Sequence, residues 1–319
     1  MASALVAHAA QSAPALACWT PADLAGQPAE RLRRHATPAD AFATPEPAAP
    51  APAVTGALAG VIRRVDLPAG VKLVALTFDL CQTRSPIAGY DGAVVDYLRG
   101  AAVPATFFAG GRWLKTHATR GAQLAADPLF ALANHSWSHP DLHSAPADKV
   151  ANEILVTEAV LAETRAAATA ACASSPSPSG PRLFRFPYGS CSDRSLAAAN
   201  AAGSVVIQWD VVSGDPDGTP ASVIERRVLS EARPGSIVVM HGNGRGTHTA
   251  EALRTIVPKL RGQGYRFVTV AELLAAGRPV AATACYIEHP GDTARYDNRP
   301  PHPLANAGEV ARPHAGGKT

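Results

Sequence analysis

The chain is poor in charged residues, and its positive charge is not concentrated. Asp, Glu, Lys and Arg make up 17% of the 319 residues, and the formal net charge is +3 at pH 7. Lys and Arg are scattered, whereas a nucleic-acid groove needs a concentrated basic face. No apolar run reaches the roughly 18 residues that span a bilayer. We therefore expect neither nucleic-acid binding nor a transmembrane segment.

Cysteine is also scarce, with five residues and no Cys-x-x-Cys pair. This pattern argues against a thiolate zinc site or a thioredoxin-type motif. The odd count leaves at least one thiol outside any disulfide formed within one chain. Apolar residues are plentiful at 47%, enough for the core of one large domain or two small ones.

The two ends of the chain differ in composition from the middle. Residues 1–55 are Ala/Pro-rich, and the stretch 36–55 predicts an extended, semi-rigid linker. Residues 15–17 (Ala-Leu-Ala) are similar to a signal-peptide cleavage site but lack a basic region before them, so an incomplete signal peptide and a disordered tail both stay open. Residues 281–319 predict a poorly ordered Pro/His-rich tail. We therefore expect one folded domain over residues 56–280.

Short β-type runs alternate with helical patterns in this middle region, which is typical of an α/β fold. The expected strands cover residues 72–79, 105–109, 132–135, 183–186, 205–209, 237–241 and 266–270. The expected helices cover residues 91–101, 146–168, 195–202, 220–232, 249–263 and 271–276. Polar residues stand at four strand ends: Asp79, His135, Asp210 and His241. In parallel α/β barrels that end gathers the active site, so we expect these residues to converge.

A pair of histidines, His135 and His139, stands four residues apart. Two imidazoles at this spacing are typical of half a divalent-metal site, and nitrogen ligands of this kind suit zinc, cobalt or nickel. The pair by itself is a weak signal, but other motifs accompany it in a fixed order.

Together these motifs resemble the polysaccharide deacetylases, carbohydrate esterase family 4, with the NodB-homology domain. They comprise Thr77-Phe78-Asp79, His135 to His139, Arg185-Phe186-Pro187-Tyr188-Gly189, Trp209 to Asp215, and Ile237 to His241. The resemblance covers roughly residues 71–276 and implies a distorted (β/α) barrel of about seven or eight units. It implies a metal-dependent hydrolase that removes N-acetyl groups from amino sugars of peptidoglycan, a chitin-like glycan or poly-N-acetylglucosamine.

The resemblance also implies roles for single residues. Asp79 becomes the general base, paired with Arg185, while His135 and His139 bind the divalent metal, with zinc expected first. His241 becomes the general acid.

Two further residues complete the implied site. Asp215 keeps His241 protonated and oriented, although Asp210 and Asp217 compete for this role. The backbone N–H of Tyr188 donates to the developing oxyanion.

One position departs from the family pattern. Most members have a second aspartate directly after the base, where it completes a His-His-Asp metal triad, but this chain has Leu80 there. An apolar side chain cannot bind a metal, so the third ligand is missing or replaced by Asp79, Asp141, His143 or water. The departure keeps a non-catalytic glycan- or metal-binding relative open as an alternative.

Two other functions stay open, a hydrolase of another linear C–N amide bond and a structural wall-associated protein. If Arg185 reaches Asp79, the loops that hold Cys81 and Cys191 become neighbours, which predicts a disulfide between them. The alternative is two small buried residues. A disulfide would indicate a periplasmic or secreted protein, with the cytoplasm as the other possibility.

Overall fold

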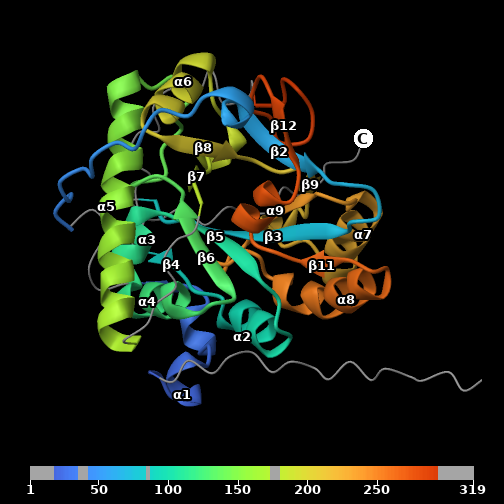
Figure 1. Ribbon diagram of the computed structural model, residues 1–319. Helices are drawn as coiled ribbons and strands as arrows, with labels where there is room; N and C mark the ends of the chain where they lie inside the picture. Colours follow the sequence, from blue (N-terminus) through green and yellow to red (C-terminus); the bar gives the residue numbers. More distant parts are fainter. Residues whose placement is uncertain (1–17, 35–41, 84–86, 173–179, 294–319) are drawn as a thin grey trace, which may run out of the picture.

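One curled sheet dominates the computed structural model, which describes residues 18–34, 42–83, 87–172 and 180–293 (Figure 1). Its strands follow the order β12-β2-β8-β7-β6-β5-β3-β10-β9, and β11 pairs with the start of β3. All neighbouring strands of this sheet are parallel except β12 and β2. The strands are β2 (Val61–Asp66), β3 (Leu73–Leu80), β5 (Ala105–Ala109), β6 (Phe130–Asn134), β7 (Arg182–Phe184), β8 (Ser204–Ile207), β9 (Val211–Val212), β10 (Ile237–His241), β11 (Arg266–Phe267) and β12 (Arg278–Ala282). A separate two-stranded sheet pairs β1 (Arg33–Arg34) with β4 (Ile87–Ala88).

The sheet curls until strands from its two sides meet. The N–H of Val65 in β2 donates to the carbonyl of Gly235, just before β10, at 2.9 Å. The result is the distorted α/β barrel that the sequence predicts. Because its strands are parallel, their carboxyl ends open at the same end of the barrel.

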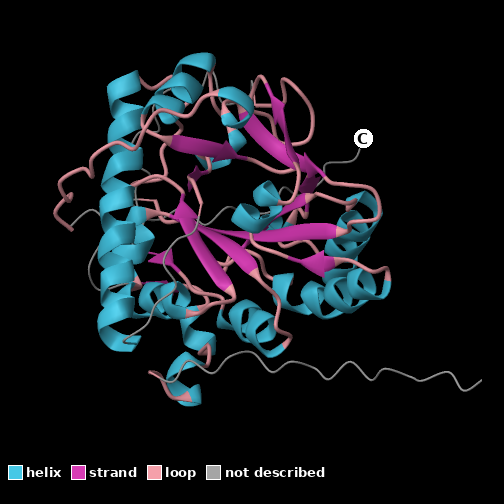
Figure 2. Cartoon of the chain, viewed as in Figure 1, coloured by secondary structure: helices cyan, strands magenta, loops and turns pink. Residues whose placement is uncertain are grey.

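Most helices lie on the outer face of the sheet, whereas the helix Val270–Ala275 packs against its inner face through Val270 and Leu273 (Figure 2). The helices are α1 (Pro21–Leu24), α2 (Gly92–Gly100), α3 (Gly111–Thr116), α4 (Ala118–Ala126), α5 (Ala147–Cys172), α6 (Asp193–Ala201), α7 (Ala221–Glu231), α8 (Thr249–Gly262) and α9 (Val270–Ala275). Short 3₁₀ turns are Pro28–Glu30, Gly56–Leu58, Pro187–Gly189 and Asp215–Asp217. None of the helices in the described ranges is long and apolar enough to cross a bilayer.

The central strand β3 is buried on both faces. All residues of Leu73–Leu80 are buried, as is usual for a parallel strand inside an α/β fold. Leu80 packs in the outer apolar cluster, which joins the sheet to α2, α3, α5, α7 and α8, whereas Leu73 and Ala75 pack in the interior cluster. Since side chains alternate along a strand, Asp79 faces the interior with the odd-numbered residues.

The expected helices are all present, with ends shifted by a few residues, and strands 105–109 and 237–241 have the predicted bounds. The expected strand 266–270 is too long, because β11 ends at Phe267 and α9 begins at Val270. Thr269 accepts from the N–H of Glu272, and the Glu272 carboxylate accepts in return from the N–H of Thr269. This capping box starts a helix where apolar content suggested a strand. Strands β2 and β12 and helices α3 and α4 were not predicted.

The regions expected to be a linker and a tail make contacts with the barrel where they are described. Residues 42–55 contain no helix or strand, but the N–H groups of Ala48 and Val54 donate to carbonyls of α5 and α6. Residues 281–293 are held to the barrel as well. The Arg63 guanidinium donates to the carbonyls of Tyr286 and Ile287 at 2.6 and 2.8 Å. Residues 1–17, 35–41 and 294–319 lie outside the described residues.

Candidate active site

The end of β3 carries a buried ion pair. Arg185, which follows β7, places Nη1 2.7 Å from Oδ1 of Asp79. The guanidinium also donates to the carbonyls of Ile207 and Gln208 and lies over the ring of Phe108, 3.9 Å from its centroid. Arg185 is fully buried and cannot turn without losing these contacts. The pairing inferred from the sequence is present, and only one oxygen of Asp79 takes part in it.

The Asp79 carboxyl is ionised at neutral pH. Burial by itself would raise its pKa, but the positive charge of Arg185 and its hydrogen bond lower the pKa below its usual value. Oδ2 of Asp79 lies 3.8 Å from Nε2 of His135. This arrangement leaves a carboxylate oxygen able to accept a proton from a group bound beside the histidines.

A second pair of an acid and a base stands at the end of β10. Asp215 is fully buried, and its Oδ1 lies 2.9 Å from Nδ1 of His241. Its Oδ2 accepts from the backbone N–H of His241 and from the Thr249 hydroxyl, both at 2.7 Å. With Nδ1 engaged, Nε2 is the nitrogen of His241 that can exchange a proton with a ligand.

The surroundings of the His241 imidazole favour its protonated form. Burial alone would lower its pKa, but Asp215, through its charge and its hydrogen bond, and then Asp79 raise the pKa above the usual value. Asp210, the alternative partner considered for His241, has a different role. Its carboxylate accepts from the N–H of Ile237 at 2.9 Å and from the Ser236 hydroxyl at 3.0 Å, so it ties down the start of β10. Asp210 therefore does not converge on the site, contrary to expectation.

The two histidines sit on a tightly bonded loop after β6. Ser136 and His139 have φ values of 67° and 54°, a left-handed conformation that is costly for residues other than glycine. Side-chain bonds hold this loop. Oδ1 of Asn134 accepts from the N–H of Ser136, and Nδ2 of Asn134 donates to Glu158 in α5. Glu153, also in α5, accepts from the N–H and hydroxyl of Ser138.

The histidine nitrogens are arranged as ligands. Nδ1 of His135 lies 2.9 Å from the Arg185 carbonyl, so it carries the hydrogen and Nε2 keeps a lone pair. Nε2 of His135 and Nδ1 of His139 are buried and have no hydrogen-bond partner. Burial lowers the pKa of both imidazoles below the usual value, which keeps them neutral, the form that binds metals. The pair therefore fits a divalent cation.

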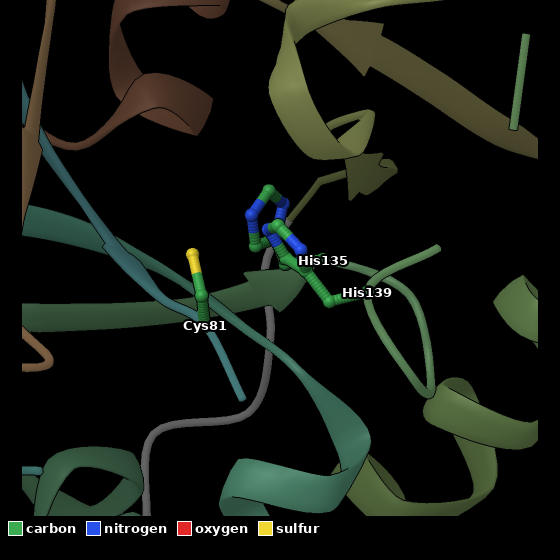
Figure 3. Close-up of side chains that lie close together, drawn as sticks. All are labelled: Cys81, His135 and His139. Carbon is green, nitrogen blue, oxygen red and sulfur yellow. The ribbon is translucent and has the colours of Figure 1, made fainter. Parts of the chain in front are cut away.

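A third donor, which no sequence motif indicated, lies beside the pair. Sγ of Cys81 and one nitrogen from each of His135 and His139 lie within 4.8 Å of one another (Figure 3). Among the described residues this is the one group of three such donors. Burial raises the pKa of the Cys81 thiol well above its usual value, so the thiol is not an activated nucleophile.

Two of the substitutes expected for the missing ligand, Asp141 and His143, lie outside the group of three donors. Leu80 is fully buried in the outer cluster, on the face of β3 away from the histidines. Asp141 is exposed, and its carboxylate accepts from the N–H of His143 within its own turn. Neither Asp141 nor His143 belongs to the group of three.

The predicted disulfide between Cys81 and Cys191 is wrong. Cys191 is bonded to Cys285, and Cys18 is bonded to Cys172, while Cys81 forms no disulfide. Cys81 and Cys191 cannot pair because they lie on different sides of the sheet. Cys191 packs in the apolar cluster beneath α5 and α6, whereas Cys81 lies with the histidines.

Tyr188 and Trp209 form part of the surroundings of the site. Tyr188 has a φ of 60°, and its ring lies edge-on to His139 with the centroids 4.7 Å apart. The ring is 39% exposed, so it borders the histidines from the solvent side. Trp209 lies in the interior cluster and donates from Nε1 to the Ile287 carbonyl at 3.1 Å.

Known proteins are similar to this chain in fold and sequence. A family model described as polysaccharide deacetylase matches residues 66–207. A peptidoglycan-N-acetylglucosamine deacetylase of Bacillus cereus is 30% identical over 207 residues, covering 64% of this chain and 69% of the relative. The chain belongs to the polysaccharide deacetylase family, and this membership makes it a hydrolase of the deacetylase class.

Two solved structures bear on the site. A family 4 acetyl xylan esterase of Clostridium thermocellum, in complex with a cobalt ion, is 27% identical with a TM-score of 0.51, covering 64% of this chain and 91% of that one. A wild-type carbohydrate esterase family 4 pseudoenzyme of Bacillus anthracis is 28% identical with a TM-score of 0.55, covering 68% of this chain and 69% of that one. The fold thus also occurs in a pseudoenzyme.

Proposed function

We propose that the protein is a metal-dependent deacetylase that removes N-acetyl groups from amino sugars of a polysaccharide. The observation that carries this proposal is the grouping of two oriented pairs, Asp79 with Arg185 and His241 with Asp215, around the buried histidines. Family membership and the named activity of the Bacillus cereus relative support peptidoglycan as the first glycan to test. Chitin-like glycans and poly-N-acetylglucosamine are the next candidates.

His135 and His139 would hold the metal, with zinc as the first choice and cobalt or nickel as alternatives. When bound, such a cation polarises the amide carbonyl and lowers the pKa of the attacking water. Asp79 takes the proton of that water at Oδ2, since Arg185 occupies Oδ1 and holds the carboxylate in place.

The leaving group needs a proton because an amide nitrogen departs as an amine. His241 donates this proton from Nε2, and Asp215 keeps the imidazole charged and oriented through Nδ1. The backbone N–H of Tyr188 is the proposed additional donor to the oxyanion. Its left-handed backbone, next to the ring of His139, supports a role at the mouth of the site.

The two disulfides support an oxidising compartment, so we propose a periplasmic or secreted location. This location agrees with an N-acetylated cell-wall glycan as substrate. Nucleic-acid binding is not part of the proposal, because the chain has no concentrated basic run.

Acetate release from N-acetylated glycans tests the proposal. The zinc- or cobalt-loaded protein should release acetate, and Asp79→Asn should lower kcat about 10²–10⁴-fold without loss of metal, because only the base is removed. Asp141→Asn is the matched control, since this exposed carboxylate lies outside the ligand group. Metal binding with no acetate release from any of the three glycans would favour the rival function, a non-catalytic binding protein like the pseudoenzyme neighbour.

A further inference from the structure

The surroundings of Cys81 differ from those of Cys191 and Cys285, which form a disulfide. Cys191 and Cys285 lie in the apolar cluster beneath α5 and α6. Cys81 joins none of the apolar clusters that the described residues form, although it directly follows β3, in which every residue is buried. Its sulfur lies instead against the two imidazoles (Figure 3). A cysteine that served only to fill the core would be expected among apolar side chains.

The imidazoles supply an independent sign that a ligand belongs there. His135 is 1% exposed and His139 is 9% exposed, yet Nε2 of the first and Nδ1 of the second have no hydrogen-bond partner. A buried polar atom left without a partner costs about 1–3 kcal/mol. A cation bound by the two imidazoles would remove that cost at His135, whose Nδ1 is already engaged by the Arg185 carbonyl, and Cys81 is the third donor within reach.

The strand register explains why residue 81, and not residue 80, can serve. Side chains alternate along β3, so Leu80 faces the helices, whereas Cys81 returns to the side of Asp79. Hydrogen bonds from the loops after β5 and β10 hold the backbone at Leu80 and Cys81 in place. The Leu80 carbonyl accepts from the N–H of Gly110, and the Cys81 carbonyl accepts from Nδ2 of Asn243, each at 3.1 Å. The thiol is therefore positioned before any cation arrives.

We propose that Cys81 is the third protein ligand of a divalent metal held by His135 and His139, in place of the aspartate that Leu80 replaces. The inference rests on the proposed function, because it places the metal of that function. Binding forms a metal–sulfur bond and breaks the S–H bond, and the proton leaves to solvent with no oxidation or reduction. Asp79 then stays with Arg185 as a carboxylate base. Three protein ligands and one open position are typical of catalytic zinc sites.

Cobalt(II) titration of the intact protein gives a readout that does not depend on activity. The wild type should show the strong near-ultraviolet absorption of a sulfur-to-cobalt charge-transfer transition, and Cys81→Ser should lose it. Cys81→Ser should also bind zinc at least about tenfold more weakly, since even a lost outer partner of a ligand costs 10–100-fold. Asp141→Asn should keep both the band and the affinity.

Zinc X-ray absorption on the wild type provides a second test that needs no variant. One sulfur neighbour at about 2.3 Å from zinc, beside nitrogen neighbours at about 2.0–2.1 Å, is the expected result. A nitrogen/oxygen-only shell, or zinc affinity unchanged in correctly folded Cys81→Ser, would overturn the proposal even if acetate is released. A sulfur shell in a protein that releases no acetate would support this ligand and count against the proposed reaction.

Discussion

Arg185 and Asp79 stand 106 positions apart in the chain, yet Nη1 of the arginine lies 2.7 Å from Oδ1 of the carboxylate in a buried site. The contact ties the segment after β7 to the end of β3 across the curled sheet. The arginine also donates to the carbonyls of Ile207 and Gln208, so its charge is fixed by the barrel itself. Stability and chemistry therefore depend on the same side chain.

Arg185→Met should destabilise the protein by about 3–5 kcal/mol, because it leaves the Asp79 charge buried without its partner. Urea unfolding followed by circular dichroism measures the loss. Arg233→Met is the matched control, since this side chain is 60% exposed and its partner Asp210 keeps its hydrogen bonds to Ser236 and Ile237, so the loss should be about 0–1 kcal/mol. Equal losses of unfolding free energy in the two variants would contradict the idea that burial makes the Arg185–Asp79 pair more important for stability.

The pairing of Asp215 with His241 leads to a prediction about pH. Because Asp215 raises the pKa of His241 while burial lowers it, Asp215→Asn should drop the pKa below its usual value. The imidazolium would then lose its proton at lower pH. The alkaline limb of the kcat/KM profile should move to lower pH by about one to three units, the effect of one close charge.

Asp210→Asn distinguishes this electrostatic effect from a loss of structure. The Asp210 carboxylate bonds the start of β10, at Ile237, and not His241. Its removal should lower the unfolding free energy while the alkaline limb stays in place. An alkaline limb that does not move in Asp215→Asn would exclude His241 as the acid that this limb reports.

The sequence predicted those strands that a short apolar run marks. β5 and β10 are short apolar runs, and their bounds agree with expectation. The pairs Asp79 with Arg185 and His241 with Asp215 followed from motif order in the family. The Gly/Pro-rich turn did not show whether Asp215 or Asp210 is the partner of His241. The fold decides this, because it places the Asp215 carboxylate at the end of β10 and the Asp210 carboxylate at its start.

Other features depend on contacts that sequence patterns do not encode. Cys191 pairs with Cys285 because residues 281–293 return to the barrel, which a Pro-rich composition did not suggest. The alternation of side chains along β3 was the sequence signal that could have identified Cys81 as a site residue. Extended past Asp79, this alternation places residue 81 on the same side of the strand as the base and residue 80 on the opposite side.

The Cys191–Cys285 disulfide should stabilise the protein by restricting the unfolded chain. It closes a loop with a sequence separation of 94, and loss of such a bond costs about 2–5 kcal/mol. The double variant Cys191→Ala/Cys285→Ala should lower the midpoint of thermal unfolding and make residues 281–293 more sensitive to protease. A Cys18→Ala/Cys172→Ala variant controls for the loss of any disulfide and should leave that segment protected.

Asn134 should control metal affinity without touching the metal. Its side chain accepts from the N–H of Ser136 and donates to Glu158, and these bonds help hold the left-handed backbone that presents His135 and His139. Asn134→Ala removes them, so the loop should relax and zinc affinity should fall about 10–100-fold, as when other supports of metal ligands are lost. Competition with a chromogenic chelator measures this affinity.

Thr164→Ala is a suitable comparison for Asn134→Ala, because it removes a buried hydrogen bond within α5 that does not reach the loop. Both variants should lose unfolding free energy by about 0.5–1.5 kcal/mol per hydrogen bond lost. Only Asn134→Ala should weaken zinc binding. If the two variants bind zinc equally well, the histidine loop keeps its shape without the asparagine, and the strained backbone at Ser136 and His139 is held by Glu153 and the Ser136 hydroxyl instead.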